Sequence, residues 1–169
     1  MFFHYFKQIL TPTECENLNQ IMVKLYNERK LNYEGNDPHY KNSFGTGSIP
    51  EMDVLFQRFT PLVKEVFKTD SIKEENTYSR VYFNGAELNP HVDRPGLDLT
   101  MSLCTFNSIE TPWPIFVELE PGKPQAIDIP PGDAALFLGT KMKHWRNPLT
   151  CPNNQFMLQS FFHWSIINN

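Results

Sequence analysis

The sequence predicts a mainly β protein of the α+β type, in which two packed sheets form a jelly roll or barrel supported by two N-terminal helices. Aromatic residues make up 14% of the 169-residue chain and 14 prolines interrupt it, as expected for short strands joined by many turns. Helical patterns precede residue 70, and short apolar segments separated by Pro- and Gly-containing turns follow residue 76. We therefore expect a single domain at 1–169, with a helical support layer at 1–70 and a β core at 76–166.

Composition argues against several classes of protein. The net charge is −4 and no run of Lys or Arg exceeds two residues, so general electrostatic binding of nucleic acid is not expected. The cysteines Cys15, Cys104 and Cys151 are too widely spaced to indicate a disulfide scaffold or a zinc ribbon. The N-terminus lacks a signal-peptide pattern and no stretch reaches transmembrane length. These features predict a cytoplasmic protein.

The first helix has a clear start signal. Residues 1–10 read as a short strand, after which Thr11 can cap a helix, Pro12 suits its first position and Glu14 completes a capping box. Apolar residues at helical spacing extend this helix to about residue 29. Residues 30–47 are polar and predict a long loop of the kind that often serves binding.

The second helix is predicted from another capping signal, Ser48-Ile-Pro-Glu51, and ends near Lys68. Its apolar stripe is clear, but Pro61 predicts a kink or a restart capped by Thr60. Both helices are expected to pack against a sheet.

Eight strands are predicted in the second part of the chain, with turn signals such as Asn84-Gly85 between most of them. The expected strands are 77–83, 87–92, 98–105, 113–119, 124–129, 133–138, 142–146 and 155–166.

The strand before residue 93 ends in His91-Val-Asp93. Residues two apart on an extended chain point to the same face, so His91 and Asp93 present an imidazole and a carboxylate side by side. Such a pair suits a divalent transition metal such as Fe(II), and a 2-His-1-carboxylate triad needs one more histidine. His-x-Asp alone is a weak signal because it arises by chance in many proteins.

The other histidines are His4, His39, His144 and His163. A lone histidine in a β core is more often a satisfied polar residue than a ligand. His144 differs from the others because it lies in a short strand soon after the segment Gly132–Gly139.

Taken together, these motifs resemble the 2-oxoglutarate- and Fe(II)-dependent oxygenases, specifically the prolyl-4-hydroxylase-like branch. The resemblance covers essentially the whole chain; the motifs that carry it, in order, are Arg80-Val-Tyr82-Phe-Asn-Gly85, His91-x-Asp93, Trp113-Pro-Ile-Phe-Val117, Pro131-Gly-Asp-Ala-Ala-Leu-Phe137, Gly139 and His144-Trp-Arg146.

The resemblance implies a double-stranded β-helix core in which His91, Asp93 and His144 hold Fe(II) and act as the catalytic centre. It also implies 2-oxoglutarate and O2 as cosubstrates, with ascorbate as an optional reductant. The expected reaction hydroxylates a C–H bond of a prolyl, peptidyl or amino-acid substrate and releases succinate and CO2.

The sequence departs from the family pattern at the residue that anchors the distal carboxylate of 2-oxoglutarate. Many members carry Arg or Lys nine or ten residues after the distal histidine, where this chain has Asn153 and Asn154. Arg146 and Arg80 are the two substitutes, and we favour Arg146 because it shares a strand face with His144. Tyr82 resembles the pocket tyrosine that hydrogen-bonds the cosubstrate. Each of the three could instead have a purely structural role.

Three further residues, Thr105, Asn107 and His163, are weaker candidates for the site. Thr105 and Asn107 could reach the cosubstrate carboxylate. Gln159, Phe161 and His163 alternate on one face of the last strand, and a satisfied core histidine is the preferred interpretation of His163.

Alternative functions remain at this point. A nucleic-acid demethylase of the same superfamily is disfavoured by the acidic balance and by the lack of two arginines after the distal histidine. A cupin-like metal-binding module without turnover stays open because the downstream Arg is missing. An interaction protein with no metal would require the joint spacing of the triad to be coincidental.

Overall fold

The computed structural model describes residues 2–35, 40–47 and 49–167, and it confirms a mainly β architecture with two helices among these residues. The helices are α1 (Pro12–Asn27) and α2 (Pro50–Phe67). The strands are β1 (Phe3–Phe6), β2 (Asn32–Tyr33), β3 (Tyr40–Gly47), β4 (Ile72–His91), β5 (Leu99–Asn107), β6 (Ile115–Glu120), β7 (Lys123–Ile127), β8 (Ala134–Phe137), β9 (His144–Arg146) and β10 (Met157–Ile166).

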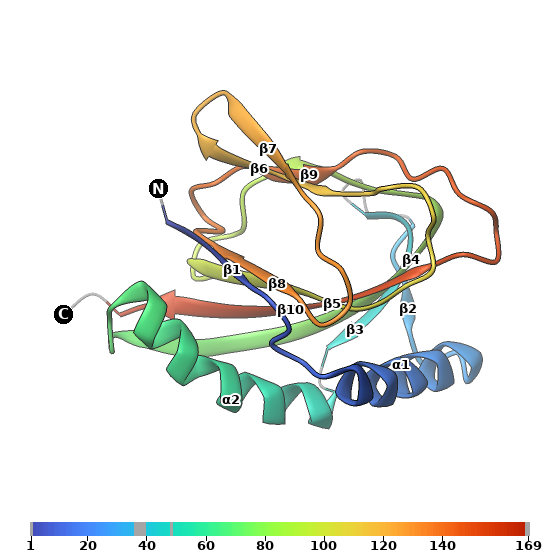
Figure 1. Ribbon diagram of the computed structural model, residues 1–169, viewed down its shortest axis with the longest axis horizontal. Helices are drawn as coiled ribbons and strands as arrows, with labels where there is room; N and C mark the ends of the chain where they lie inside the picture. Colours follow the sequence, from blue (N-terminus) through green and yellow to red (C-terminus); the bar gives the residue numbers. More distant parts are fainter. Residues whose placement is uncertain (1, 36–39, 48, 168–169) are drawn as a thin grey trace.

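The strands form one curled antiparallel sheet with the order β1-β8-β5-β10-β4-β9-β6-β7, and β3 also pairs with β4. Both helices lie against the layer made by β1, β8, β5, β10 and the first half of β4 (Figure 1). The strands β9, β6 and β7 form the opposite layer of the jelly roll (Figure 1). The long strand β4 belongs to both layers, because it pairs with β10 over residues 72–82 and with β9 over residues 88–91.

The predicted turn at Asn84-Gly85 is wrong, since β4 runs through both residues. Its pairing with β3 jumps from Ser43–Tyr82 to Lys41–Glu87, so the strand bends by a bulge instead of reversing. Gly85 has a φ of +81°, and its N–H donates to the carbonyl of Leu149 at 2.8 Å.

The loop predicted at 30–47 is also wrong in part. Residues 32–33 and 40–47 form the paired strands β2 and β3, and β3 adds to the edge of β4. The sequence of this segment is polar, but its backbone covers a sheet edge that would otherwise present unpaired N–H and C=O groups.

The start of α1 follows the prediction, whereas the start of α2 departs from it. Helix α2 ends at Phe67 with Lys68 as its C-cap, as predicted. The side chain of Thr11 accepts from the N–H of Glu14, and the carboxylate of Glu14 accepts from the N–H of Thr11, as a capping box requires. Ser48 lies outside the described residues, and the N-cap of α2 is Ile49, without a side-chain cap. Helix α2 passes through Pro61 without a restart, because its buried face packs continuously on the sheet.

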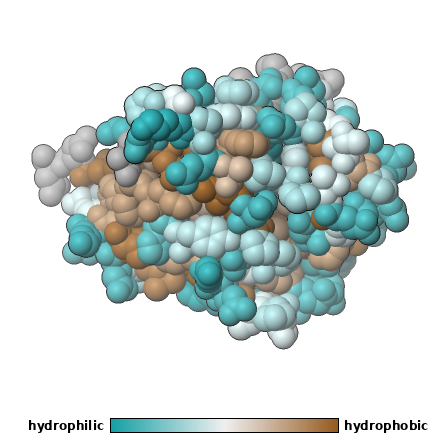
Figure 2. All heavy atoms as spheres, turned by 45° about the horizontal axis from the view of Figure 1, so that its top comes forward, coloured by the Kyte–Doolittle hydropathy of each residue, from teal (hydrophilic) through white to brown (hydrophobic). Residues whose placement is uncertain are grey.

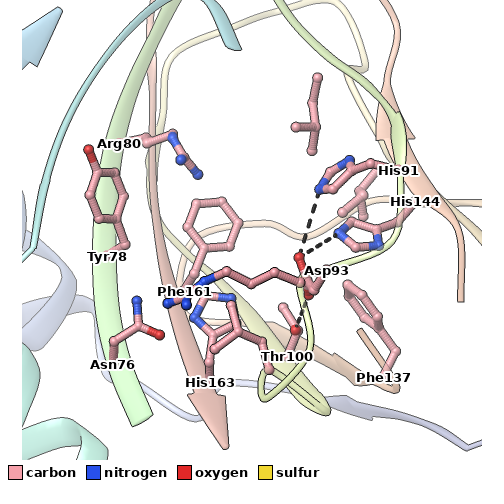
Figure 3. Close-up of a pocket in the computed structure, with 14 residues that line it drawn as sticks. Asn76, Tyr78, Arg80, His91, Asp93, Thr100, Phe137, His144, Phe161 and His163 are labelled. Carbon is pink, nitrogen blue, oxygen red and sulfur yellow. Dashed lines mark hydrogen bonds and ion pairs between the residues drawn. The ribbon is translucent and has the colours of Figure 1, made fainter. Parts of the chain in front are cut away.

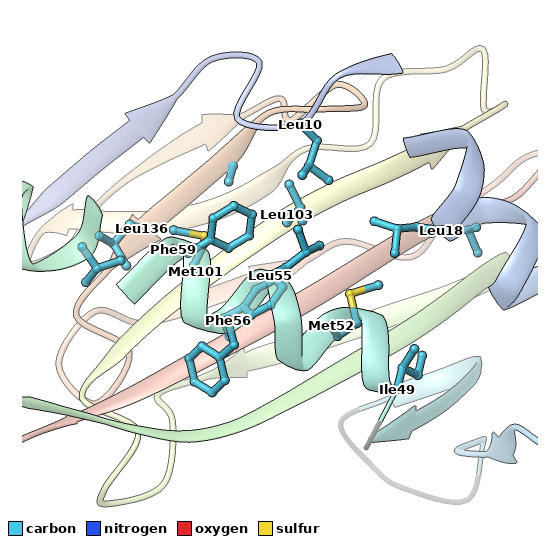
Figure 4. Packing of buried hydrophobic residues seen from close by; sticks show 14 of the residues in the cluster. Leu10, Leu18, Ile49, Met52, Leu55, Phe56, Phe59, Met101, Leu103 and Leu136 are labelled. Carbon is cyan, nitrogen blue, oxygen red and sulfur yellow. The ribbon is translucent and has the colours of Figure 1, made fainter. Parts of the chain in front are cut away.

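Alternation along the strands separates two apolar cores. One core lies between the helices and the sheet, where Met52, Leu55, Phe56 and Phe59 of α2 cover strand residues such as Met101 (Figure 4). The other core lies inside the jelly roll and contains Tyr82, Trp113, Ile115, Phe137 and Phe161. Successive side chains of a strand point to opposite faces of the sheet, so one contacts the helices and the next points into the jelly roll. The polar residues on the inner face therefore lie inside the jelly roll.

On the face shown in Figure 2, hydrophilic side chains cover most of the surface, and hydrophobic ones gather on its left side and near its centre. None of the described helices is both long enough and apolar enough to span a membrane. The three cysteines are free thiols, two of them buried.

Candidate metal centre

The structure brings together the three predicted metal ligands. His91 ends β4 and His144 begins β9, and the two residues pair directly in the antiparallel register. Asp93 follows β4, and its Oδ1 lies 3.8 Å from Nε2 of His91 and 3.7 Å from Nε2 of His144. One ligand atom from each residue lies within 4.8 Å of the other two.

Both imidazoles are oriented in the same way. Nδ1 of His91 lies 2.8 Å from the carbonyl oxygen of Asn89, and Nδ1 of His144 lies 2.9 Å from that of Met142. A carbonyl only accepts, so each Nδ1 carries the proton and each Nε2 is a lone-pair donor that faces Asp93. Burial lowers the pKa of His144, which favours the neutral form that a metal requires.

Asp93 is held from two sides. The hydroxyl of Thr100 donates to Oδ2, while Oδ1 faces the histidines, and the N–H of Asp93 donates to the carbonyl of Gly139 at 2.9 Å. A Cβ at position 139 would lie 2.1 Å from Oδ2 and 2.3 Å from the Thr100 hydroxyl. The carboxylate therefore occupies space that only glycine leaves empty at this position.

A cavity of about 190 Å³ opens beside the triad (Figure 3). Its lining includes the apolar side chains of Leu88, Ile115, Phe137 and Phe161, and polar side chains line the wall opposite the triad. The polar wall carries Asn76, Tyr78, Arg80 and His163 (Figure 3).

His163 is part of this wall, and the expectation of a satisfied core histidine is wrong for its Nδ1, which is buried without a hydrogen-bond partner. Burial lowers the pKa of His163 to about 4, so the imidazole is neutral at neutral pH. Of the remaining histidines, His4 packs against Phe6 on β1, and His39 lies outside the described residues.

Arg80 points into the cavity, but it already has an acidic partner. Its Nε lies 2.7 Å from the carboxylate of Glu34, and both side chains are 13% exposed. The guanidinium also stacks on the ring of Tyr78, with 4.6 Å between its carbon and the ring centroid. The hydroxyls of Tyr78 and Ser43 complete the coordination of the Glu34 carboxylate.

Arg146 lies deeper and is not on the wall of the cavity. It is 3% exposed and donates to the carbonyl of Trp113 and, at 2.9 Å, to Oε1 of Gln159. Tyr82 is completely buried, and burial raises the pKa of its hydroxyl, an effect that the nearby guanidiniums of Arg80 and Arg146 oppose. Thr105 is buried with an unpartnered hydroxyl, whereas Asn107 accepts from the N–H of Ile109 in a local turn.

Thr100 and Glu34 belong to the site but were not predicted from the sequence. Their partners lie 7 and 46 positions away, so no local motif marks either residue.

No protein-family model matches the sequence, and no curated protein matches it either. Solved structures match the fold over nearly the whole chain. A prolyl-4-hydroxylase from Pseudomonas putida superposes with a TM-score of 0.77 at 13% identity, covering 95% of this chain and 91% of that one. The fold is that of the 2-oxoglutarate–Fe(II) oxygenases.

Two other members of this fold match similarly. The viral collagen prolyl hydroxylase of Paramecium bursaria Chlorella virus-1, solved with 2-oxoglutarate, has a TM-score of 0.72 at 15% identity and coverages of 99% and 97%. A prolyl hydroxylase from Trichoplax adhaerens, solved with a hypoxia-inducible-factor peptide, has a TM-score of 0.73 at 12% identity and coverages of 96% and 83%. These matches confirm the predicted fold.

The donor set fits the metal of this oxygenase fold. Two neutral imidazole nitrogens and one carboxylate oxygen converge on a single point, and the cavity opens beside them. This donor set matches the 2-His-1-carboxylate pattern of non-haem Fe(II) sites, a pattern that leaves open positions for small ligands.

Proposed function

We propose that the protein is a 2-oxoglutarate- and Fe(II)-dependent dioxygenase that hydroxylates a C–H bond. The observation that supports this most is the convergence of His91, Asp93 and His144 beside a cavity, within a fold shared with such enzymes. Bound Fe(II) would supply the oxidative chemistry, in which 2-oxoglutarate and O2 are consumed and succinate and CO2 are released.

The protein's own groups have three tasks in this proposal. The triad holds the metal, with Thr100 and Gly139 fixing the carboxylate of Asp93. The apolar part of the cavity lining, which includes Phe137, excludes water from the cosubstrate. Arg146, Tyr82 and Arg80 are the candidate contacts of 2-oxoglutarate.

The proposed substrate is a prolyl or peptidyl group or an amino acid. Prolyl hydroxylases among the structural neighbours support this choice, one of them solved with a peptide. A net charge of −4 supports a substrate other than nucleic acid. The three free thiols suit a reducing compartment, and we propose the cytoplasm.

The direct test is an anaerobic titration of Fe(II)-loaded protein with 2-oxoglutarate, followed by visible absorption. We expect a weak charge-transfer band that saturates with 2-oxoglutarate and is lost in His91→Ala. His4→Ala is the matched control, because His4 lies on β1 and belongs to neither the triad nor the cavity lining. Iron binding without any band would contradict the proposal and favour a metal-binding module.

A further inference from the structure

The polar wall of the cavity has one part that is satisfied within the protein and one part that is not. Tyr78 and Arg80 of β4 both contact the carboxylate of Glu34. Asn76 lies two residues before Tyr78 on the same strand face, and its register partner on β10 is His163. Asn76 and His163 line the cavity opposite the triad, next to the satisfied part (Figure 3).

Asn76 and His163 each have a polar atom that the protein leaves without a partner. Oδ1 of Asn76 and Nδ1 of His163 are buried and accept or donate no hydrogen bond, and His163 is only 8% exposed. Buried polar atoms are almost always paired, so two such atoms on one cavity wall indicate a partner that comes from outside the protein. Both side chains are neutral, because an amide carries no charge and burial lowers the pKa of His163 to about 4.

Arg94 adds a positive charge to this part of the cavity. It follows Asp93 in the sequence, lines the same cavity and is exposed. No ion pair joins Arg94 to an acidic side chain in the part of the chain that the structure describes. Hydrogen bonds from Ser165 and Lys73 lower the pKa of Glu75, and the charge of Arg94 adds to this effect without a direct contact. The guanidinium of Arg94 is therefore available to an anion in the cavity.

The charges that line the cavity favour a carboxylate over an ammonium group. Asp93 is the only acidic residue of the lining among the described residues, and the proposed metal occupies it. The carboxylate of Glu34, 2.7 Å away, neutralises Arg80, whereas Arg94 keeps its charge. An ammonium group in the cavity would lose water without gaining an anionic partner, which costs free energy. A carboxylate would instead form charge-assisted hydrogen bonds with a guanidinium.

We propose that Arg94, Asn76 and His163 form the subsite that selects the primary substrate, and that this substrate carries a carboxylate but no ammonium group near the C–H bond that reacts. This inference rests on the proposed function. Arg94 binds the carboxylate, while Asn76 and His163 form hydrogen bonds with a neutral polar group such as an amide. The carboxylate can come from two sources, the α-carboxylate of an N-acylated amino acid and the acidic side chain of a peptide.

The test uses four proline derivatives that differ only in their end groups. N-acetylproline carries a carboxylate alone, prolinamide carries an ammonium group alone, proline carries both, and N-acetylprolinamide carries neither. Their dissociation constants are measured by anaerobic calorimetry on Fe(II)-loaded protein saturated with 2-oxoglutarate, so that no turnover occurs. We expect N-acetylproline to bind about 10-fold more tightly than N-acetylprolinamide, and prolinamide to bind most weakly.

Two capped dipeptides distinguish the sources of the carboxylate. Acetyl-Pro-Glu-amide and acetyl-Pro-Gln-amide differ only in a side-chain carboxylate. Tighter binding of the Glu dipeptide, without a preference for N-acetylproline over its amide, would support the subsite and assign it to an acidic peptide. Tighter binding of N-acetylproline alone would support the subsite and assign it to an α-carboxylate.

Single variants test the three residues against matched controls. Arg94→Gln should remove the preference for carboxylate probes, whereas Arg29→Gln, with the same charge change at an exposed position after α1, should retain it. Asn76→Asp adds an anion of the same size to the wall, so it should weaken N-acetylproline about 10-fold and strengthen prolinamide. Asn32→Asp on the exposed strand β2 should do neither. His163→Phe should weaken the acetylated probes about 10-fold, because it removes a partner of their amide.

Several outcomes would overturn the subsite. One is equal binding of N-acetylproline and N-acetylprolinamide together with equal binding of the two dipeptides. Another is a carboxylate preference that persists in folded Arg94→Gln. Weaker binding of 2-oxoglutarate in Arg94→Gln, with unchanged selectivity among the probes, would place Arg94 on the cosubstrate. Absence of binding by every probe, in protein that shows the charge-transfer band, would also reject the subsite. Absence of the band itself would reject the proposed function, and the subsite with it.

Discussion

Thr100 donates a hydrogen bond to one carboxylate oxygen of Asp93, and the other oxygen faces both ligand histidines. The two residues meet because Asp93 follows the end of β4 and Thr100 lies near the start of β5. The hydroxyl of Thr100 thus determines which oxygen of Asp93 faces the metal position, although Thr100 is not itself a proposed ligand.

Thr100→Val should weaken metal binding by about 10- to 100-fold, because the carboxylate loses the bond that orients it. The measurement is a competition titration of Fe(II) or Co(II) against a chelator. Ser102→Ala is the matched control, since Ser102 lies two residues along the same strand face and its hydroxyl has no partner. An equal loss in both variants would contradict a specific role of Thr100.

Gly139→Ala should abolish tight metal binding, because the new Cβ would lie 2.1 Å from Oδ2 of Asp93. The clash is with a ligand side chain and with Thr100, so we expect displacement of the carboxylate. Metal titration of folded protein, verified by circular dichroism, provides the measurement. Gly47→Ala is the control, because its nearest contact would be 3.4 Å away. Unaltered metal affinity in Gly139→Ala would mean that Asp93 does not bind the ion.

Glu34→Ala should reduce the free energy of unfolding by about 3 kcal/mol, because it leaves the mostly buried guanidinium of Arg80 without its carboxylate. Urea denaturation measures the change, and a double-mutant cycle with Arg80→Gln isolates the pair. Glu87→Ala is the comparison, since its partner Lys41 is 53% exposed. Glu87→Ala should reduce the free energy of unfolding by less than about 1 kcal/mol. A similar loss of stability in both variants would contradict the buried ion pair between Glu34 and Arg80.

The metal-free protein should lose stability as the pH falls from about 6.5 towards 4. Burial lowers the pKa of His163 to about 4 in the folded protein, from an ordinary 6.5. As the pH falls, the unfolded chain therefore binds the proton at a higher pH than the folded protein does. Up to about 3 kcal/mol of the free energy of unfolding, which is present above pH 6.5, is lost on acidification. Urea denaturation at several pH values tests this. His163→Phe, which cannot bind a proton, should show a smaller loss, and an equal loss would contradict the assignment.

The sequence by itself determined the elements that depend on local geometry. The capping box of Thr11 and Glu14 starts α1 as predicted, because both partners are three residues apart. The two-residue period of a strand places Arg146 on the face of His144. His91 and Asp93 meet as predicted, although β4 ends at His91 and Asp93 follows the strand. The order of these motifs was sufficient to indicate the oxygenase fold.

Polar composition and turn-forming residues gave wrong predictions where a segment pairs with a strand far away in the sequence. Asn84-Gly85 has the composition of a turn, but β4 continues through it. The side chain of Asn42 donates to the carbonyl of Asn84, and the N–H of Gly85 donates to the carbonyl of Leu149. The composition of residues 40–47 is typical of a loop, but they form a strand because they pair with the edge of β4.

Only the tertiary structure decided which arginine carries its own counter-ion. The sequence offers both Arg80 and Arg146 as candidate anchors and favours Arg146 by its strand face alone. In the structure, Glu34 reaches Arg80 from the segment between β2 and β3, while Gln159 reaches Arg146 from β10. The electrostatic role of a charged side chain depends on what surrounds it after burial. The local sequence does not predict those neighbours, because they come from segments far apart in the chain.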